Sequence, residues 1–332
     1  MIKYLGSKRL LISKIIDIIK EEKAETVLDL FSGTSRVGHA LQNEGITVHS
    51  NDINTYAYFL AQTYVVADPS LFGKLERAVN RLNKISPKTT PGWFTETYCE
   101  KSKFFHPKNG LKLEAIREEI DKYRWKDPKL LVPLIVSLIE AADRVDSTCG
   151  IQMAYLKEWS ARAHNDLELR IPNVSKGSGY AMQMDAKEAA KTKVDLAYLD
   201  PPYNQHNYLG NYHIWETVCL WDEPETYGKA QKRVDVKTRK SNFNSKKKIF
   251  DEFKSVIDNL SAPKALVSFN NEGYLTQEQI SDILKSKFNT VEVLELPYKR
   301  YVGAKIGIHN KKGEKVGEVT HTENKELLFL AK

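Results

Sequence analysis

The stretch Thr26-Val27-Leu28-Asp29-Leu30-Phe31-Ser32-Gly33-Thr34-Ser35-Arg36 decides the fold class. Residues 26–30 form a short apolar strand, a turn around Gly33 follows, and residues 36–44 have the spacing of a helix that ends at Gly45. A second strand at 46–50 and a second helix at 55–66 come directly after it. Strand, helix, strand, helix is typical of an α/β fold with a doubly wound, mostly parallel sheet.

This alternation stops after residue 68 and resumes near residue 194. The intervening chain is mostly helical, and later strands are predicted at 194–199, 265–269, 291–296 and 326–330, with a glycine-rich hairpin between the last two. Asp29 and Asp200, which both follow strands, are 171 positions apart, whereas a strand-helix unit takes roughly 30 residues. We therefore expect residues 1–68 and 177–332 to form one domain, with residues 69–176 as a mainly helical inserted subdomain.

The composition is that of a globular chain: of its 332 residues, 41% are hydrophobic and 28% are charged. No stretch approaches roughly 18 apolar residues and the N-terminus lacks a signal-peptide pattern, so we expect no membrane contact and a cytoplasmic location. Cys99, Cys149 and Cys219 are too few and too widely spaced for a disulfide framework. His206 and His213, near Cys219, match no metal-site spacing, and we predict no metal.

Positive charge is concentrated in one stretch, residues 229–248, which we call the basic segment. It holds nine Lys or Arg against one acid, a net charge of +8, whereas the whole chain has +7, so the remainder is close to neutral at about −1. A local concentration of this kind favours contact with a polyanion over a role in general solubility. A solvated loop is the alternative, and the interleaved Phe243, Asn242 and Asn244 favour nucleic acid.

Acidic residues follow both of the first two strands. Asp29 precedes a turn that has only Gly33 and Gly38, whereas a dinucleotide-binding loop needs G-x-G-x-x-G. A carboxylate there repels phosphate and suits an ammonium group, although an ordinary turn remains an alternative. Asp52 lies 23 positions after Asp29, a spacing at which an acid binds ribose hydroxyls in nucleoside-binding folds. Its alternative role is to cap the next helix.

The tetrapeptide Asp200-Pro201-Pro202-Tyr203 follows the apolar strand 194–199. Two prolines end the sheet ladder, so the chain must turn at the carboxyl end of a strand, where open α/β sheets bind ligands. The turn offers a carboxylate, free carbonyls and an aromatic ring. These groups suit a planar amino group, which needs acceptors in its plane and a ring against its face.

Two weaker candidates lie elsewhere. Asp185, followed by Ala186, precedes the Asp200 strand and either accepts a hydrogen bond from an adenine or caps a short helix. Tyr4 and Lys8 precede the first helix and could contact a ring and a carboxylate, or form only a basic N-terminus.

The order of these segments (residues 3–9, 29–38 and Asp52, then an insert, Asp185 and residues 200–203) resembles the Dam-like adenine-specific DNA methyltransferases of bacterial modification systems, the class with an Asp-Pro-Pro-Tyr motif. The resemblance covers most of the chain outside the insert. It implies a Rossmann-like methyltransferase domain, S-adenosyl-L-methionine as the methyl donor, and transfer to N6 of a flipped-out adenine in double-stranded DNA. It also implies DNA target recognition by the insert and a cognate restriction endonuclease as a partner.

The same resemblance assigns roles to individual residues. The catalytic set is Asp200, Pro201, Pro202 and Tyr203. The cofactor-binding set is Tyr4, Lys8, Asp29, Phe31, Ser32, Gly33, Asp52, Asp185 and Ala186, with Lys8 and Asp29 at the methionine end, Asp52 at the ribose and Asp185 at the adenine ring. The DNA-binding set comes from the basic segment: Lys232, Arg233, Lys237, Arg239, Lys240, Lys246, Lys247 and Lys248.

Other enzymes that methylate an amino group are the first alternatives: N4-cytosine DNA, RNA adenine or protein glutamine methyltransferases. Aspartate at position 200 favours adenine by family analogy, and the insert and the basic segment favour DNA. A nicotinamide-dependent oxidoreductase would need the missing diphosphate-binding glycines. A non-catalytic nucleic-acid-binding subunit would be expected to have a damaged tetrapeptide, and this one is intact.

Overall fold

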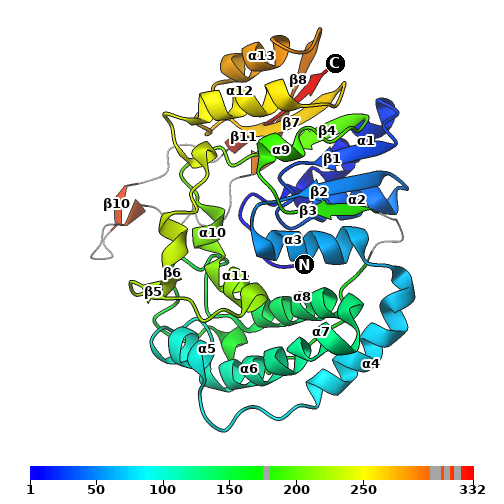
Figure 1. The fold of residues 1–332 in the computed structure, drawn as a ribbon. Coiled ribbons are helices and arrows are strands. Elements are labelled where there is room, and N and C mark those ends of the chain that lie inside the picture. Colours follow the sequence, from blue (N-terminus) through cyan, green and yellow to red (C-terminus); the bar gives the residue numbers. More distant parts are fainter. Residues whose placement is uncertain (175–178, 300–307, 310–314, 318–322) are drawn as a thin grey trace.

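The computed structural model describes residues 1–174, 179–299, 308–309, 315–317 and 323–332, and its centre is a seven-stranded sheet (Figure 1). The strand order is β3-β2-β1-β4-β7-β11-β8. Neighbouring strands from β3 to β7 are parallel, and β11 runs antiparallel to both β7 and β8. The strands are β1 (Thr26–Asp29), β2 (Thr47–Asn51), β3 (Tyr180–Met182), β4 (Leu196–Leu199), β7 (Ala265–Asn270), β8 (Val291–Lys299) and β11 (Glu323–Ala331). The predicted doubly wound, mostly parallel sheet is therefore confirmed.

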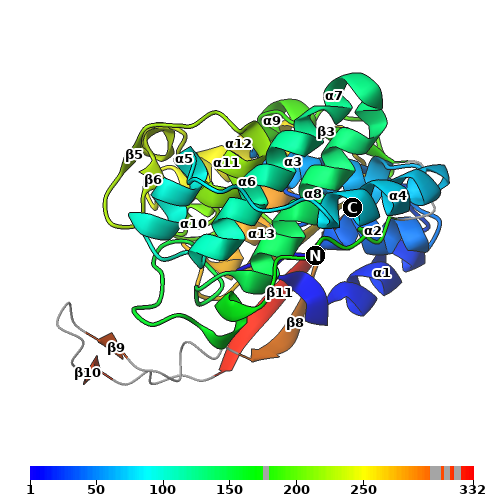
Figure 2. The same cartoon turned by 90° about the horizontal axis from the view of Figure 1, so that it is seen from below.

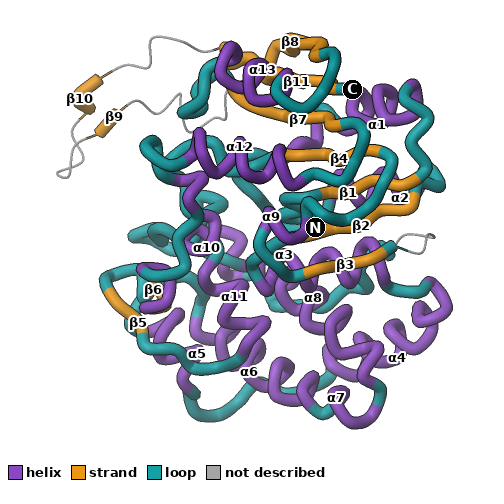
Figure 3. The backbone as a smooth tube through the Cα atoms, turned by 45° about the horizontal axis from the view of Figure 1, so that its top comes forward, coloured by secondary structure: helices purple, strands orange, loops and turns teal. Residues whose placement is uncertain are grey.

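Helices cover both faces of this sheet because alternate residues of a strand point to opposite faces. Val27 of β1 and Leu196 of β4 belong to one hydrophobic cluster, whereas their neighbours Leu28 and Ala197 belong to the other. Helices α1 (Ile12–Glu21), α2 (Arg36–Asn43) and α3 (Thr55–Ala61) contribute to the first cluster, and α9 (Ala186–Ala189), α12 (Ile249–Asn259) and α13 (Gln277–Lys285) to the second. Figure 3 shows the sheet between these two sets of helices.

A further helical layer packs against α3. It contains α4 (Phe72–Asn83), α5 (Trp93–Thr95), α6 (Pro107–Asp121), α7 (Tyr123–Lys126) and α8 (Pro128–Val145), together with α10 (Tyr208–Asn211) and α11 (His213–Leu220) (Figure 2). Arg117 of α6 is buried and donates to the carbonyls of Val218 and Cys219, at 2.8 and 3.3 Å. The segment that follows the tetrapeptide is thereby fixed to the insert, and a short hairpin of β5 (Thr226–Tyr227) and β6 (Lys232–Arg233) extends from it.

Some elements differ from the sequence prediction. The helix expected at 55–66 divides into α3 and a π-helix over Gln62–Val66, and neither β3 nor α12 was predicted. β8 and β11 pair as antiparallel strands, as expected for the last two. Between them β9 (Ile308–His309) pairs with β10 (Lys315–Gly317), while Gly303, Gly307 and Gly313 lie outside the described residues. No helix in the described part of the chain combines the length and apolar character needed to cross a bilayer.

Candidate active site

A pocket of about 320 Å³ opens where β1, β2 and β4 end. Parallel strands place their carboxyl ends at one edge of the sheet, which is where such folds bind ligands. Eleven of the predicted catalytic and cofactor-binding residues line this pocket: Tyr4, Lys8, Asp29, Phe31, Ser32, Gly33, Asp52, Asp185, Ala186, Asp200 and Pro202. The fold therefore brings together segments that are up to about 200 positions apart in the sequence.

Asp29 is the last residue of β1, and its side chain is 2% exposed. Its Oδ2 atom has no hydrogen-bond partner among the described residues. Burial, with the nearby charge of Asp200, raises the pKa of Asp29 to about 7, although the Gly38 N–H acts in the opposite direction. A buried carboxylate is costly unless a cation pairs with it. This position therefore suits an ammonium group and opposes a phosphate.

The turn around Gly33 connects Asp29 to Asp52, the acid that follows the second strand. Gly33 has a φ of +49°, and a Cβ there would lie 3.1 Å from the Tyr4 ring, so both its conformation and its close packing require glycine. Its N–H donates to Oδ2 of Asp52 at 3.1 Å, and Oδ1 of Asp52 accepts from the backbone N–H of Asn54 at 2.9 Å. Burial raises the pKa of Asp52 to about 6 despite these hydrogen bonds. The acid is thus fixed at the pocket wall.

Aromatic rings form other parts of the wall. Tyr4 stacks on Tyr208 and Tyr212, with ring centroids 5.2 and 4.7 Å apart. The Phe31 ring meets Phe243 edge to face, at 5.2 Å between centroids. The rings bring the N-terminus and the basic segment to the pocket, with flat apolar surfaces suited to a purine or a methionine chain.

Asp200 faces a buried lysine. Nζ of Lys8 lies 3.1 Å from Oδ1 of Asp200 and also forms an ion pair with Glu326 of β11. Glu326 is buried and accepts from Oγ of Ser268 at 2.7 Å. Burial raises the pKa of Asp200 to about 6, and Lys8 limits that rise. Lys8 therefore lies between two carboxylates, those of Glu326 and of the catalytic candidate Asp200.

Of the rest of the tetrapeptide, Pro202 lines the pocket, whereas Pro201, which is buried, and Tyr203 are not among its lining residues. The Tyr203 ring packs against Phe269 at 5.6 Å between centroids, and its carbonyl accepts from the Tyr274 N–H at 2.8 Å. These contacts hold the turn rigidly against β7.

In this structure Asp185 caps a short helix, which is one of the two roles predicted for it. It is exposed, and its Oδ1 accepts from the Lys187 N–H at 2.9 Å, which caps α9. Asp185 and Ala186 also line the pocket, so the helix cap and the pocket wall are the same residues.

The basic segment divides into two environments. Lys246, Lys247 and Lys248 are exposed just before α12, and Lys237 is exposed with its ammonium group 4.1 Å from the Tyr227 ring centroid. Lys232 is partly buried, and Lys240 lines the pocket.

Two arginines of this segment are paired with carboxylates of the protein, one of them buried and the other partly exposed. Arg233 is buried and pairs with Asp222 at 2.7 Å and Asp235 at 3.1 Å, so its guanidinium is turned away from any phosphate backbone. Arg239 lines the pocket and pairs with Glu216 at 2.8 Å. The lysines at 237 and 246–248 are therefore accessible to solvent, whereas the Arg233 guanidinium is held by two carboxylates.

Two site residues were missed by sequence reasoning, Glu216 and Glu326. Each is buried with a cation beside it, Glu216 among mostly apolar residues of α11 and Glu326 directly before the apolar half of β11. An acid within an apolar run could have identified Glu216, since acids are seldom buried without a partner. Glu326 follows the polar residues 323–325 of its strand, so it carries no such signal.

The histidines play a structural part. His213 is fully buried, its Nε2 lies 3.1 Å from the carbonyl oxygen of Gln152, and burial lowers its pKa to about 3. Within the described ranges no three His, Cys, Asp or Glu side chains are arranged to hold a metal ion.

Comparison with known proteins gives one consistent result. Residues 4–283 match the family model of the D12 class N6 adenine-specific DNA methyltransferases. The chain is 33% identical over 322 residues to the modification methylase StsI of Streptococcus sanguinis and 31% identical over 327 residues to the type II methyltransferase M.FokI of Planomicrobium okeanokoites. These alignments cover 90% of this chain but 48% and 49% of the relatives, so the chain spans about half their length. The type II methyltransferase M.NlaIII of Neisseria lactamica is 28% identical, with 96% of this chain and 98% of that protein covered. The predicted resemblance is confirmed, and the chain belongs to the D12 class N6 adenine-specific DNA methyltransferase family.

Proposed function

We propose that this chain transfers a methyl group from S-adenosyl-L-methionine to N6 of a flipped-out adenine in double-stranded DNA, as the modification enzyme of a restriction-modification system. One observation carries the proposal: the Asp29 and Asp200 carboxylates line a single pocket at the carboxyl edge of the sheet. Asp29 suits the ammonium group of a methionine, and Asp200 suits the amino group of a base. Family membership and the modification methylases among the relatives support the same activity.

The pocket fits S-adenosyl-L-methionine by its charge pattern. The buried, unpaired Oδ2 of Asp29 would accept a hydrogen bond from the ammonium group. Asp52 would accept hydrogen bonds from the ribose hydroxyls, and Asp185 would accept one from the amino group of the adenine. Phe31, Ser32 and Gly33 would surround the methionine end. When bound, the cofactor supplies an electrophilic methyl group on a sulfonium centre.

The residues of the tetrapeptide would prepare the base. A duplex buries the adenine amino group in base pairing, so the adenine must leave the stack. Asp200 and the Pro201 carbonyl would accept the two amino hydrogens, and Tyr203 would stack on the base. These hydrogen bonds draw the nitrogen lone pair out of conjugation with the ring, so that the amino nitrogen becomes nucleophilic. Positioning and fixed charges supply the acceleration, and no covalent link to the protein is needed.

Nucleoside analysis tests the activity. Purified protein would be incubated with S-adenosyl-L-methionine and, in parallel, with duplex DNA or with RNA, and each nucleic acid would be digested and its nucleosides separated by liquid chromatography. We expect N6-methyladenine as the product. N4-methylcytosine, methylation of RNA alone, or no product would contradict the proposal in three distinguishable ways. Sequencing DNA from expressing cells with modification detection would then give the recognition site.

We infer that residues 69–176 read the DNA target, while 1–68 and 177–332 carry the chemistry. α11 packs both on α8 of the insert and on α3 of the 1–68 part, so the segment after Asp200 joins the two regions. A cognate endonuclease as partner and a cytoplasmic location, where the DNA substrate and free thiols of Cys99, Cys149 and Cys219 are both expected, complete the proposal.

Neutralising the exposed lysines should weaken DNA binding. Each phosphate contact contributes about 0.9 to the slope of log affinity against log salt, so the triple change Lys246→Gln, Lys247→Gln, Lys248→Gln should reduce the slope by up to about 2.7. Fluorescence anisotropy with a duplex between about 50 and 200 mM salt measures this. The matched control neutralises Lys20, Lys23 and Lys285, which are exposed at helix ends on the opposite edge of the sheet. An equal loss of slope in both variants would refute a specific contact.

Asp29 should control cofactor affinity. Loss of a hydrogen bond between charged groups costs about 1.5–3 kcal/mol, so Asp29→Asn should weaken S-adenosyl-L-methionine binding on the order of 10- to 100-fold. The carboxylate form is needed, and its pKa is about 7, so wild-type affinity should fall as the pH drops from 8 to 6. Asp29→Asn should lose much of this dependence in titration calorimetry. Asp195→Asn, which alters an exposed carboxylate before β4 at the opposite edge, should leave affinity unchanged.

A further inference from the structure

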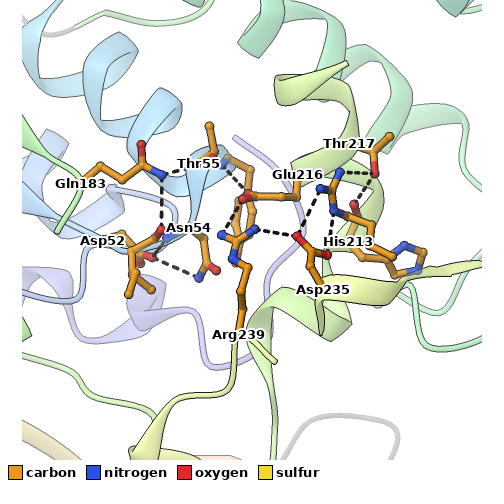
Figure 4. Close-up of polar contacts among 12 residues, drawn as sticks. Asp52, Asn54, Thr55, Gln183, His213, Glu216, Thr217, Asp235 and Arg239 are labelled. Atoms are coloured by element: carbon orange, nitrogen blue, oxygen red, sulfur yellow. Dashed lines mark hydrogen bonds and ion pairs between the residues drawn. The ribbon is translucent and has the colours of Figure 1, made fainter. Parts of the chain in front are cut away.

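Arg239 differs from the exposed lysines of the basic segment because both Nη atoms of its guanidinium pair with carboxylates of the protein. Nη2 lies 2.8 Å from Oε1 of Glu216, and Nη1 lies 3.2 Å from Oδ2 of Asp235 (Figure 4). Glu216 is fully buried in α11. The Arg239 side chain is 34% exposed, so this ion pair joins a fully buried carboxylate, which requires a partner, to a cation at the protein surface.

The second carboxylate oxygen of Glu216 contacts the helix that follows Asp52. Oε2 accepts from the Tyr56 N–H at 3.0 Å, in the first turn of α3. The start of a helix favours a negative charge, since its N–H groups have no partner within the helix. α3 begins directly after Asn54, whose N–H donates to Asp52. Figure 4 shows Arg239 between Glu216 and Asp235, with which it is paired, and shows Asp52 and Asn54 on the side of Arg239 away from Asp235.

The charge of Glu216 acts on Asp52. Burial is the first cause that raises the pKa of Asp52, and the carboxylate of Glu216 raises it further. The other ionisable groups that face Asp52 are Asp29 from β1, Tyr4 from the N-terminal segment and Tyr56 from α3. Arg239 pairs directly with Glu216 and lines the same pocket as Asp52. It is therefore placed to cancel the charge that opposes ionisation of Asp52.

We propose that Arg239 and Glu216 form a positioning pair for the cofactor site: Glu216 fixes the start of α3, and Arg239 neutralises Glu216 so that Asp52 remains an ionised acceptor for ribose hydroxyls. Arg239 then serves the cofactor and not the DNA phosphates, although it lies in the basic segment. The inference rests on the proposed function, because it assumes that Asp52 binds a ribose.

The experiment measures ligand affinity against pH in the absence of DNA. The probe is 5′-methylthioadenosine, which has the adenine and ribose but no ammonium group, so that titration of Asp29 contributes little. Titration calorimetry from pH 5 to 8.5 would compare the wild type, Arg239→Gln, Glu216→Gln and the double variant. Lys246→Gln, which neutralises an exposed cation in the same segment, is the matched control.

In the wild type the affinity should fall as the pH drops through about 6, the pKa of Asp52. Arg239→Gln leaves Glu216 uncompensated, so the midpoint should move to higher pH, by about one unit for an electrostatic change worth a tenfold difference in affinity. Glu216→Gln should move it to lower pH, and the double variant should return it to the wild-type value or below. Lys246→Gln should not move it.

The outcomes separate the two proposals. An unchanged midpoint in Arg239→Gln, combined with a smaller salt slope for DNA binding, would show that Arg239 is a phosphate contact and overturn the inference. If Arg239→Gln does not fold, two other variants provide the comparison. The double variant leaves no unpaired buried carboxylate, and Arg239→Lys keeps the positive charge. A midpoint shift in Arg239→Lys as large as that expected for loss of the charge would also overturn the inference. Failure of the wild type to bind both 5′-methylthioadenosine and S-adenosyl-L-methionine would instead contradict the proposed function.

Discussion

Asp200→Ala is expected to abolish methyl transfer while the protein still binds S-adenosyl-L-methionine. Removing one preorganised group at a reacting centre lowers the rate on the order of 10²–10³-fold, and Asp200 is the only tetrapeptide carboxylate that can accept from an amino group. The cofactor should remain bound, because Asp29 and Asp52 are untouched. Loss of the Asp200 charge should even favour ionisation of Asp29, whose pKa that charge raises. Single-turnover methylation and titration calorimetry measure the two effects separately.

The matched variant is Asp200→Asn, which keeps the shape and one carbonyl acceptor but removes the charge. We expect it to retain more activity than Asp200→Ala and to lose the acid limb of the rate profile, which in the wild type should fall as pH drops through about 6. Turnover close to that of the wild type in Asp200→Ala would remove Asp200 from the catalytic set. Loss of cofactor binding in both variants would indicate a folding role instead.

Lys8→Met should have the second-largest effect, on stability and activity together. Although burial by itself lowers the pKa of Lys8, Asp200 and Glu326 hold that pKa well above its ordinary value. Removing the lysine leaves the buried carboxylate of Glu326 and the partly buried carboxylate of Asp200 without this counter-charge. Breaking one partner of a buried ion pair costs about 3–5 kcal/mol of unfolding free energy. Urea denaturation at pH 8 should show a loss of that size.

The pH dependence of this loss can be stated in advance. Without Lys8 the pKa of Asp200 should rise above its value of about 6, so Asp200 should take up a proton at higher pH. The destabilisation should therefore be largest at pH 8 and should shrink as the pH falls and the second negative charge disappears. Lys20→Met is the control, because Lys20 and Glu44 form an exposed pair, worth about 0–1 kcal/mol. Equal losses in the two variants would contradict the role given to Lys8.

The fold class was accessible from the sequence because it depends on local patterns. The strand at 26–29, the turn at Gly33 and the helix at 36–43 each have a period or a breaker that can be read without knowing their neighbours. The edge strand β3 has only three residues, of which Tyr180 is exposed, so it has no hydrophobic pattern. Helix α12, which was not predicted, has Ile249, Phe253 and Val256 at helical spacing, but it begins directly after three lysines, a charge run that is typical of a loop.

The sequence predicted those site residues that directly follow a strand. It did not predict the role of residues that depend on a partner far away in the sequence. Asp29, Asp52 and Asp200 follow strands, so their meeting at one edge is a consequence of parallel topology. The pairing of Lys8 with Asp200 and Glu326 depends on contacts across 192 and 318 positions. Similarly, the positive charge of Arg233 gave no sign that Asp222 and Asp235 would enclose it.

The position of β11 has a consequence for the order of events during synthesis. β11 is made after β7 and β8, yet it is inserted between them, and it carries Glu326 to Lys8, which lies 318 positions earlier in the sequence. A nascent chain that has not yet released this strand leaves β7 with an open edge and Lys8 without one of its two counter-charges. Such long-range pairing forms late and slowly. We therefore expect the site to become competent only after β11 has left the ribosome, so that translation products that stop before residue 323 would not modify DNA.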